Sequence, residues 1–122
     1  MKTLDEFFAS YGEMHDAVIR DITISYTLYS KLPTIIINSD CILIADEDNW
    51  ANLKIQLFEV EEFRILELNS SNKIIFELSI SRLGEKLIFN FSPNIVPSES
   101  VEEHRGSSFY AVCKSFWYEE IV

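Results

Sequence analysis

An imidazole and a carboxylate stand side by side at His15 and Asp16, and this pair is the first candidate for chemistry. Together the two groups could bind a metal ion or transfer a proton. Metal-dependent phosphohydrolases with a His-Asp motif need further His and Asp ligands on a helical scaffold, whereas this chain has one other histidine, His104, and reads mostly as strands. Alternatively, both side chains satisfy backbone groups between a helix and a strand. We favour this structural interpretation, and an enzyme using the pair would require both side chains in a cleft.

A thiol nucleophile would need a histidine beside it and a third group to orient that histidine. Cys113 and His104 are available, but Cys41 and Cys113 both lie in apolar, strand-like stretches. A thiol buried in a strand stays protonated and unreactive. We therefore favour two free core cysteines over a disulfide between them, and we expect a solvated His104. The cysteine spacing does not suggest zinc.

Paired carboxylates occur at 61–62, 102–103 and 119–120. Glycosidase-like catalysis needs two carboxylates at a defined separation across a cleft, and abundance alone supplies no geometry. The three glycines are isolated, so a glycine-rich phosphate loop is not indicated. We therefore expect a protein that is not an enzyme, with no metal and no cofactor.

The acidic charge indicates which partners suit the chain. It has 122 residues, of which 48% are hydrophobic, with 20 acids against 10 Lys and Arg and a formal net charge of −10. Such a surface repels nucleic acid and anionic lipid and suits a basic protein partner, although it can also serve solubility alone. No apolar run is long enough to span a bilayer. We expect one cytoplasmic domain, 1–122, that binds neither nucleic acid nor membrane.

Any site must be positioned by the expected helix and strands. Thr3 and Glu6 have capping-box spacing, and the apolar residues that follow predict a short amphipathic helix over 3–11, ended by Gly12. From Ala17 onward the apolar residues recur at about every second position, which is typical of a strand. A long strand is expected to 28, with one apolar face that Arg20 interrupts. These face residues are Val18, Ile22, Ile24, Tyr26 and Leu28.

The stretch 34–45 predicts either one strand with a bulge at 38–40 or a small hairpin, and we favour the bent strand. Further strands are expected at 53–57, 63–68, 74–80, 87–91 and 109–117, with a turn at 84–85 and the longest loop at 92–106. The fold class is α+β. A short N-terminal helix would pack on a curled, mostly antiparallel sheet or partial barrel of about seven strands.

Acidic clusters and two aromatic residues near the end of the chain are the candidate contacts for a partner. Trp and Tyr anchor many interfaces, and flanking carboxylates would attract a basic surface. Strand alternation can bury only one of Trp117 and Tyr118 on a given face. The candidate contact residues are Asp46, Glu47, Asp48, Glu59, Glu61, Glu62, Glu102, Glu103, Trp117 and Tyr118.

Two segments carry a resemblance to known proteins. Residues 14–17 read Met-His-Asp-Ala and lead into a strand, and residues 50–63 form a strand that ends in Phe58-Glu-Val60 before another apolar residue. In both, the chain resembles predicted immunity proteins of bacterial polymorphic toxin systems. Where that pattern has Gly before the Val, this chain has Glu59. The resemblance implies a non-catalytic protein that binds and neutralises a cognate toxin.

A second hypothesis is a small ligand-binding, barrel-like domain. Its apolar pocket would lie between the curved sheet and the helix. The expected lining residues are Phe7, Phe8, Phe76 and Phe89.

Overall fold

A computed structural model describes most of the chain. The described residues are 3–12, 14, 17–27, 31–44, 49–65, 74–75, 78–91 and 109–121. Helix α1 spans Leu4–Tyr11, and the Thr3 hydroxyl accepts a hydrogen bond of 3.2 Å from the Glu6 N–H at its start. Gly12, with φ 57°, follows its last turn. The predicted helix and both of its ends are therefore confirmed.

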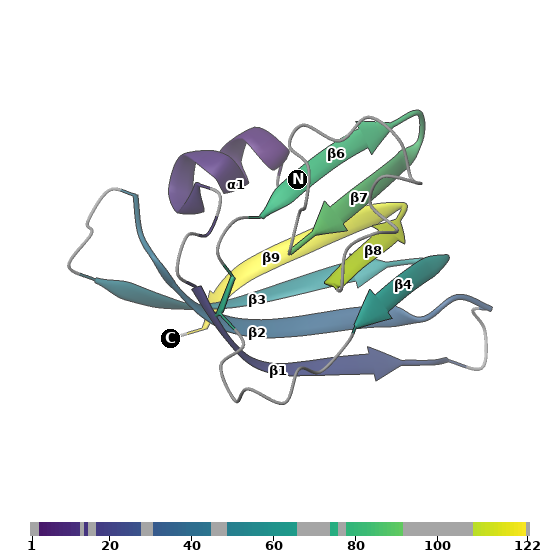
Figure 1. Ribbon diagram of the computed structural model, residues 1–122, viewed down its shortest axis with the longest axis horizontal. Helices are drawn as coiled ribbons and strands as arrows, with labels where there is room; N and C mark the ends of the chain where they lie inside the picture. Colours follow the sequence, from purple (N-terminus) through teal and green to yellow (C-terminus); the bar gives the residue numbers. More distant parts are fainter. Residues whose placement is uncertain are drawn as a thin grey trace.

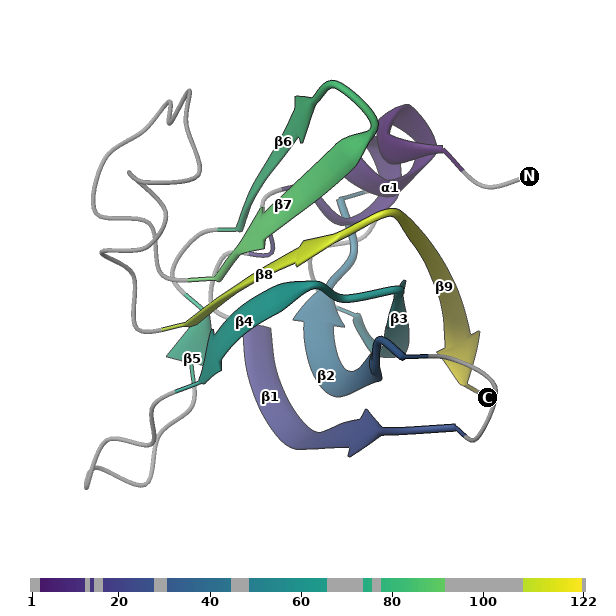
Figure 2. The same cartoon turned by 90° about the vertical axis from the view of Figure 1, so that its right-hand side faces the viewer.

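Five strands form the larger of two sheets, in the order β5-β1-β2-β3-β9 (Figure 1, with β5 labelled in Figure 2). Every pairing in this sheet is antiparallel. Residues of β2 and β3 alternate regularly between the core and the other face of the sheet. The strands are β1 (Ala17–Ser25), β2 (Thr34–Ile42), β3 (Trp50–Phe58), β5 (Ile74–Ile75) and β9 (Ser115–Ile121).

Four strands form the smaller sheet, in the order β4-β8-β7-β6, again with antiparallel pairings only. The predicted hairpin is confirmed, because β6 and β7 are joined by a turn in which Gly84 has φ 64°. The strands are β4 (Glu62–Ile65), β6 (Ser79–Leu83), β7 (Lys86–Asn90) and β8 (Phe109–Cys113). The two sheets are not closed into a barrel. The described residues form eight strands of four or more residues and the two-residue β5, which is more than the seven strands predicted.

Two predicted strands are each divided between the sheets. The expected strand 109–117 is β8 in the small sheet and β9 in the large one, with a bend at Lys114 (Figure 2). The expected strand 74–80 is β5 in the large sheet and β6 in the small one. Both predictions of single strands were wrong, because apolar alternation continues on either side of a corner and does not mark the corner itself.

A bulge at Arg20 corrects the predicted apolar face of β1. Ile19 pairs with Ser39 and Asp21 pairs with Asn38, so β1 has one residue more than β2 between these pairs. The extra residue shifts the alternation, which places Val18 on the exposed face and buries Ile19. Residues 34–42 form one strand as favoured, but the irregularity lies in its partner. β1 also ends at Ser25, before the predicted 28.

The main core lies between the sheets and is closed at one end by α1. Phe7 is fully buried, and its ring centroid lies 5.2 Å from that of Tyr118 and 6.5 Å from that of Phe116. A smaller cluster on the other face of the small sheet consists of Ile88, Tyr110 and Val112, with Leu83 packed against it. The small sheet therefore buries apolar side chains on both of its faces.

Candidate functional site

The corner between β3 and β4 contains the best-described acidic cluster, Glu59, Glu61 and Glu62. Three backbone hydrogen bonds hold this corner. Val60 N–H donates to the Pro33 carbonyl at 3.0 Å, Glu61 N–H to Val112 at 2.9 Å, and Lys114 N–H to Phe58 at 3.2 Å. The pair β3–β9 of the large sheet thus continues at this corner into the pair β4–β8 of the small sheet. Val60 is buried at the corner.

Glu59 has φ 52°, in the left-handed region that glycine adopts most easily. A residue with a Cβ atom pays about 1–2 kcal/mol there. The turn at this position is therefore one that Gly would favour, with Glu in its place. The side chain of Glu59 is exposed.

The other two carboxylates of the corner are engaged within the protein. Glu61 Oε1 lies 2.6 Å from Lys86 Nζ, and Glu62 Oε2 accepts a hydrogen bond of 2.7 Å from the Tyr110 hydroxyl. A partner that used Glu61 or Glu62 would compete with these contacts. Glu59 is therefore the more accessible of the predicted acidic contacts at this corner.

Trp117 and Tyr118 point to opposite faces of β9. Trp117 is 39% exposed on the outer face of the large sheet, whereas Tyr118 is 6% exposed and packs on Phe7, Tyr11 and Phe116. Burial raises the pKa of Tyr118, and the nearby carboxylate of Glu6 adds to this. Of the two predicted aromatic contacts, only Trp117 presents its side chain at the surface.

Several predicted residues lie outside the described part of the chain. The acidic cluster at 46–48 and the acids at 102–103 belong to this group, as does the whole loop 92–106. His15, Asp16 and His104 also lie outside it. The hypothesis of an enzyme based on His15 and Asp16 therefore stays untested.

Both cysteines are free and fully buried, as the sequence predicts. Burial raises the pKa of Cys41 to about 12, with further contributions from Glu120 and Asp40, and burial alone raises the pKa of Cys113 to about 12. Near neutral pH both thiols are protonated and are poor nucleophiles. Beside Cys41, the Tyr11 hydroxyl donates a hydrogen bond of 2.8 Å to Glu120 Oε1, and burial is the larger cause of the raised pKa of Tyr11.

The ring packing bears on the alternative of an apolar pocket. Phe7 and Phe89 are fully buried, and the Phe89 ring centroid lies 5.6 Å from that of Phe116 and 6.4 Å from that of Phe91. Phe8 is partly buried and meets Phe7 edge to face, while Phe76 lies outside the described residues. At Phe7 and Phe89 the proposed lining is occupied by neighbouring rings, which is the packing of a core.

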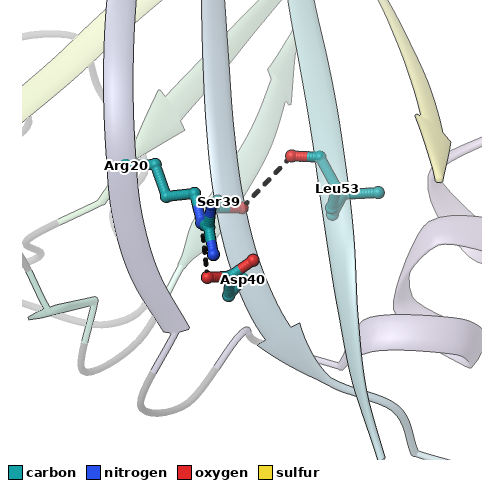
Figure 3. A network of polar contacts seen from close by, with 4 residues as sticks. All are labelled: Arg20, Ser39, Asp40 and Leu53. Atoms are coloured by element: carbon teal, nitrogen blue, oxygen red, sulfur yellow. Dashed lines mark hydrogen bonds and ion pairs between the residues drawn. The ribbon is translucent and has the colours of Figure 1, made fainter. Parts of the chain in front are cut away.

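Two polar contacts that no local sequence pattern indicates join β1 to β2 and β2 to β3, one on each face of the large sheet (Figure 3). Arg20 Nε lies 2.6 Å from Asp40 Oδ2 on the neighbouring strand, and the Ser39 hydroxyl, turned to the core, is 3.5 Å from the Leu53 carbonyl oxygen. The one available signal was Arg20 itself, which interrupts the apolar alternation where the bulge occurs. Opposite charges on neighbouring strands become visible only when the register is known.

Within the described ranges, no group of three or more His, Cys, Asp or Glu side chains is arranged to hold a metal ion. No helix in that part of the chain is long and apolar enough to cross a membrane. Comparison of the chain with models of protein families, with curated proteins and with solved structures finds no match in any of the three.

Proposed function

We propose that this protein is a non-catalytic cytoplasmic immunity protein that binds a basic bacterial toxin and neutralises it by covering its active surface. The proposal starts from the resemblance of residues 14–17 and 50–63 to immunity proteins. It is supported by the charge of the chain, because 20 acids against 10 basic residues favour association with a basic surface.

Glu59 is the observation that carries the proposal. It is an exposed carboxylate in a backbone conformation that suits glycine better, at the corner within the second resembling segment. Strained residues occur often at functional sites, where the strain is offset elsewhere in the fold. A carboxylate at this position has no benefit for the turn, whereas it adds negative charge next to Glu61 and Glu62.

The buried thiols agree with a binding role. Their raised pKa values keep both in the unreactive protonated form, so Cys41 and Cys113 act as core residues. The described surface also carries carboxylates and exposed aromatic side chains, which can serve as contact groups.

The test is a pull-down of this protein with a salt titration, in which the bait is the toxin domain encoded by the adjacent gene. We expect binding at low salt that weakens as salt is raised, because the ions screen the attraction between the acidic and the basic surface. Failure to bind at low salt would contradict the proposal. An upstream gene for a large secreted toxin would identify the bait.

A matched pair of charge reversals locates the contact. Glu59→Lys should weaken binding roughly tenfold, about 1.4 kcal/mol, and leaves the strain at φ 52° as it was. Asp5→Lys makes the same change of charge at an exposed residue of α1, a helix that lies far from the β3–β4 corner (Figure 1). Equal effects of the two variants would show that only net charge matters and that the corner is not the contact.

A further inference from the structure

The outer face of the large sheet carries four of the seven large hydrophobic side chains that are exposed on the described part of the chain. Its outward residues follow from the pairing register, because each faces away from the buried alternate positions of the same strand. Trp50 is 53% exposed, Ile121 is 45% exposed and Trp117 is 39% exposed. The apolar outward residues are Val18, Ile36, Ile42, Trp50, Phe58, Trp117 and Ile121.

The two sheets differ in the burial of apolar side chains on their outer faces. The small sheet buries Ile88, Tyr110 and Val112 on the face turned away from the main core. The large sheet instead leaves large side chains exposed on its corresponding face, including both tryptophans of the chain. Exposed apolar patches of several hundred Å² usually mark an interaction surface.

Four of the five charged side chains on this face form ion pairs with one another, and the fifth, Asp21, accepts a hydrogen bond from an amide. Arg20 lies 2.6 Å from Asp40, Lys54 lies 3.9 Å from Glu119, and Asn38 Nδ2 donates a hydrogen bond of 2.6 Å to Asp21. Two cations and three carboxylates leave this face with a charge of −1, whereas the chain as a whole has −10. This face is therefore nearly neutral on a strongly acidic molecule.

Neutrality and size together favour one occupant. Two copies of a strongly acidic chain repel each other wherever acidic surfaces meet, so a nearly neutral apolar face is where they can associate. Four strands about 4.8 Å apart and about 26 Å long cover roughly 500 Å² per copy, hence roughly 1,000 Å² for two copies, which reaches the lower limit for a specific interface.

We infer that the outer face of the large sheet, formed by β1, β2, β3 and β9, is the interface of a homodimer. This inference does not depend on the proposed toxin binding, for which Glu59 at the β3–β4 corner is the contact. The two associations also respond to salt in opposite directions. Salt screens the repulsion between two acidic copies and strengthens the dimer, whereas it weakens binding to a basic toxin.

Sedimentation velocity on the full chain, from about 1 to about 100 µM and at about 0.05 and 0.5 M NaCl, tests the inference. We expect a species of twice the 14.2 kDa chain mass, populated more at the higher salt. Intrinsic fluorescence offers a second readout, because both tryptophans lie on the proposed interface. Their emission should shift to shorter wavelength as the protein concentration rises.

The variant Trp50→Glu with Ile121→Glu places two charges on the face without changing a buried residue, and it should be monomeric at every concentration. Tyr26→Glu is the control. Tyr26 is 68% exposed, but it lies just after β1 at a position whose alternation assigns it to the other face of the large sheet. The control should dimerise like the wild type. Circular dichroism of each variant checks that the fold is kept.

Three outcomes would overturn the inference. The first is a wild-type chain that is monomeric over the whole range at both salt concentrations. The second is a dimer that the double variant leaves intact. The third is a monomeric chain whose double variant loses toxin capture, which would make the face a contact for the toxin instead of a second copy.

Discussion

Glu59 has a backbone conformation that costs free energy and an exposed, negatively charged side chain. Its φ of 52° is explained by the corner, where Val60 and Glu61 must both turn their N–H groups to carbonyls of other segments. The acidic residues of this corner are evident in the sequence, but their surroundings are not. Glu61 and Glu62 turn out to be bonded to Lys86 and Tyr110, which no local pattern indicates.

At this position, Glu59→Gly should raise the free energy of unfolding by about 0.5–1 kcal/mol, because it removes the left-handed strain but adds freedom to the unfolded chain. Urea denaturation monitored by circular dichroism measures the change. Glu59→Ala serves as the control and should show no such gain, since alanine keeps the Cβ atom. A lower stability of the Gly variant would contradict the assigned strain.

At the scale of elements, a single inserted residue decides which side chains of β1 enter the core. Ala17 and Ile19 precede the bulge and are buried, while Ile22 follows it and packs against the same core. The bulge keeps both halves of the strand facing inward across nine residues. Without it, one half of the strand would face solvent.

Deletion of Arg20 should therefore cost about 2 kcal/mol or more, roughly the loss of one buried Ile side chain. Arg20→Ala is the matched variant, because it keeps the extra residue and loses only an exposed ion pair with Asp40, worth less than about 1 kcal/mol. Urea unfolding of both variants distinguishes the two contributions. Similar losses in the two variants would show that the ion pair, and not the register, stabilises β1.

At the scale of the whole molecule, one core joins the first helix to the last strand. Tyr11 from α1, Cys41 from the large sheet and Cys113 from the small sheet all belong to the same buried cluster. Each has a pKa raised chiefly by burial. Loss of a proton from any of them therefore becomes easier only when the core opens.

This linkage predicts alkaline unfolding. The thiols have a pKa near 9 when unfolded and about 12 when folded, so they contribute their full stability below pH 9 and lose it progressively as the pH rises to about 12. Between pH 8 and 10 the loss should approach about 1.4 kcal/mol for each thiol. Urea unfolding at about pH 8, 9 and 10 measures this fall in the free energy of unfolding.

The variant Cys113→Ala is the control for this prediction. It should be less stable than the wild type at pH 8, because it leaves space in the core, but its stability should fall less steeply between pH 9 and 10. An identical pH dependence of the two proteins would show that Cys113 is not protected from ionisation by folding.

Local patterns in the sequence determined the helix with its Thr3 cap and Gly12 stop, the β6–β7 hairpin, and the buried alternate positions of β2 and β3. Each depends on neighbours within a few residues, so periodicity and capping chemistry suffice. The position of the corners at Lys114 and between β5 and β6 was decided by tertiary structure, because alternation is the same before and after a corner. Tertiary structure also decided which side of β9 packs on α1, and this buries Tyr118 and leaves Trp117 exposed. Alternation divides the residues of a strand between two faces, but it does not determine which face packs against the core.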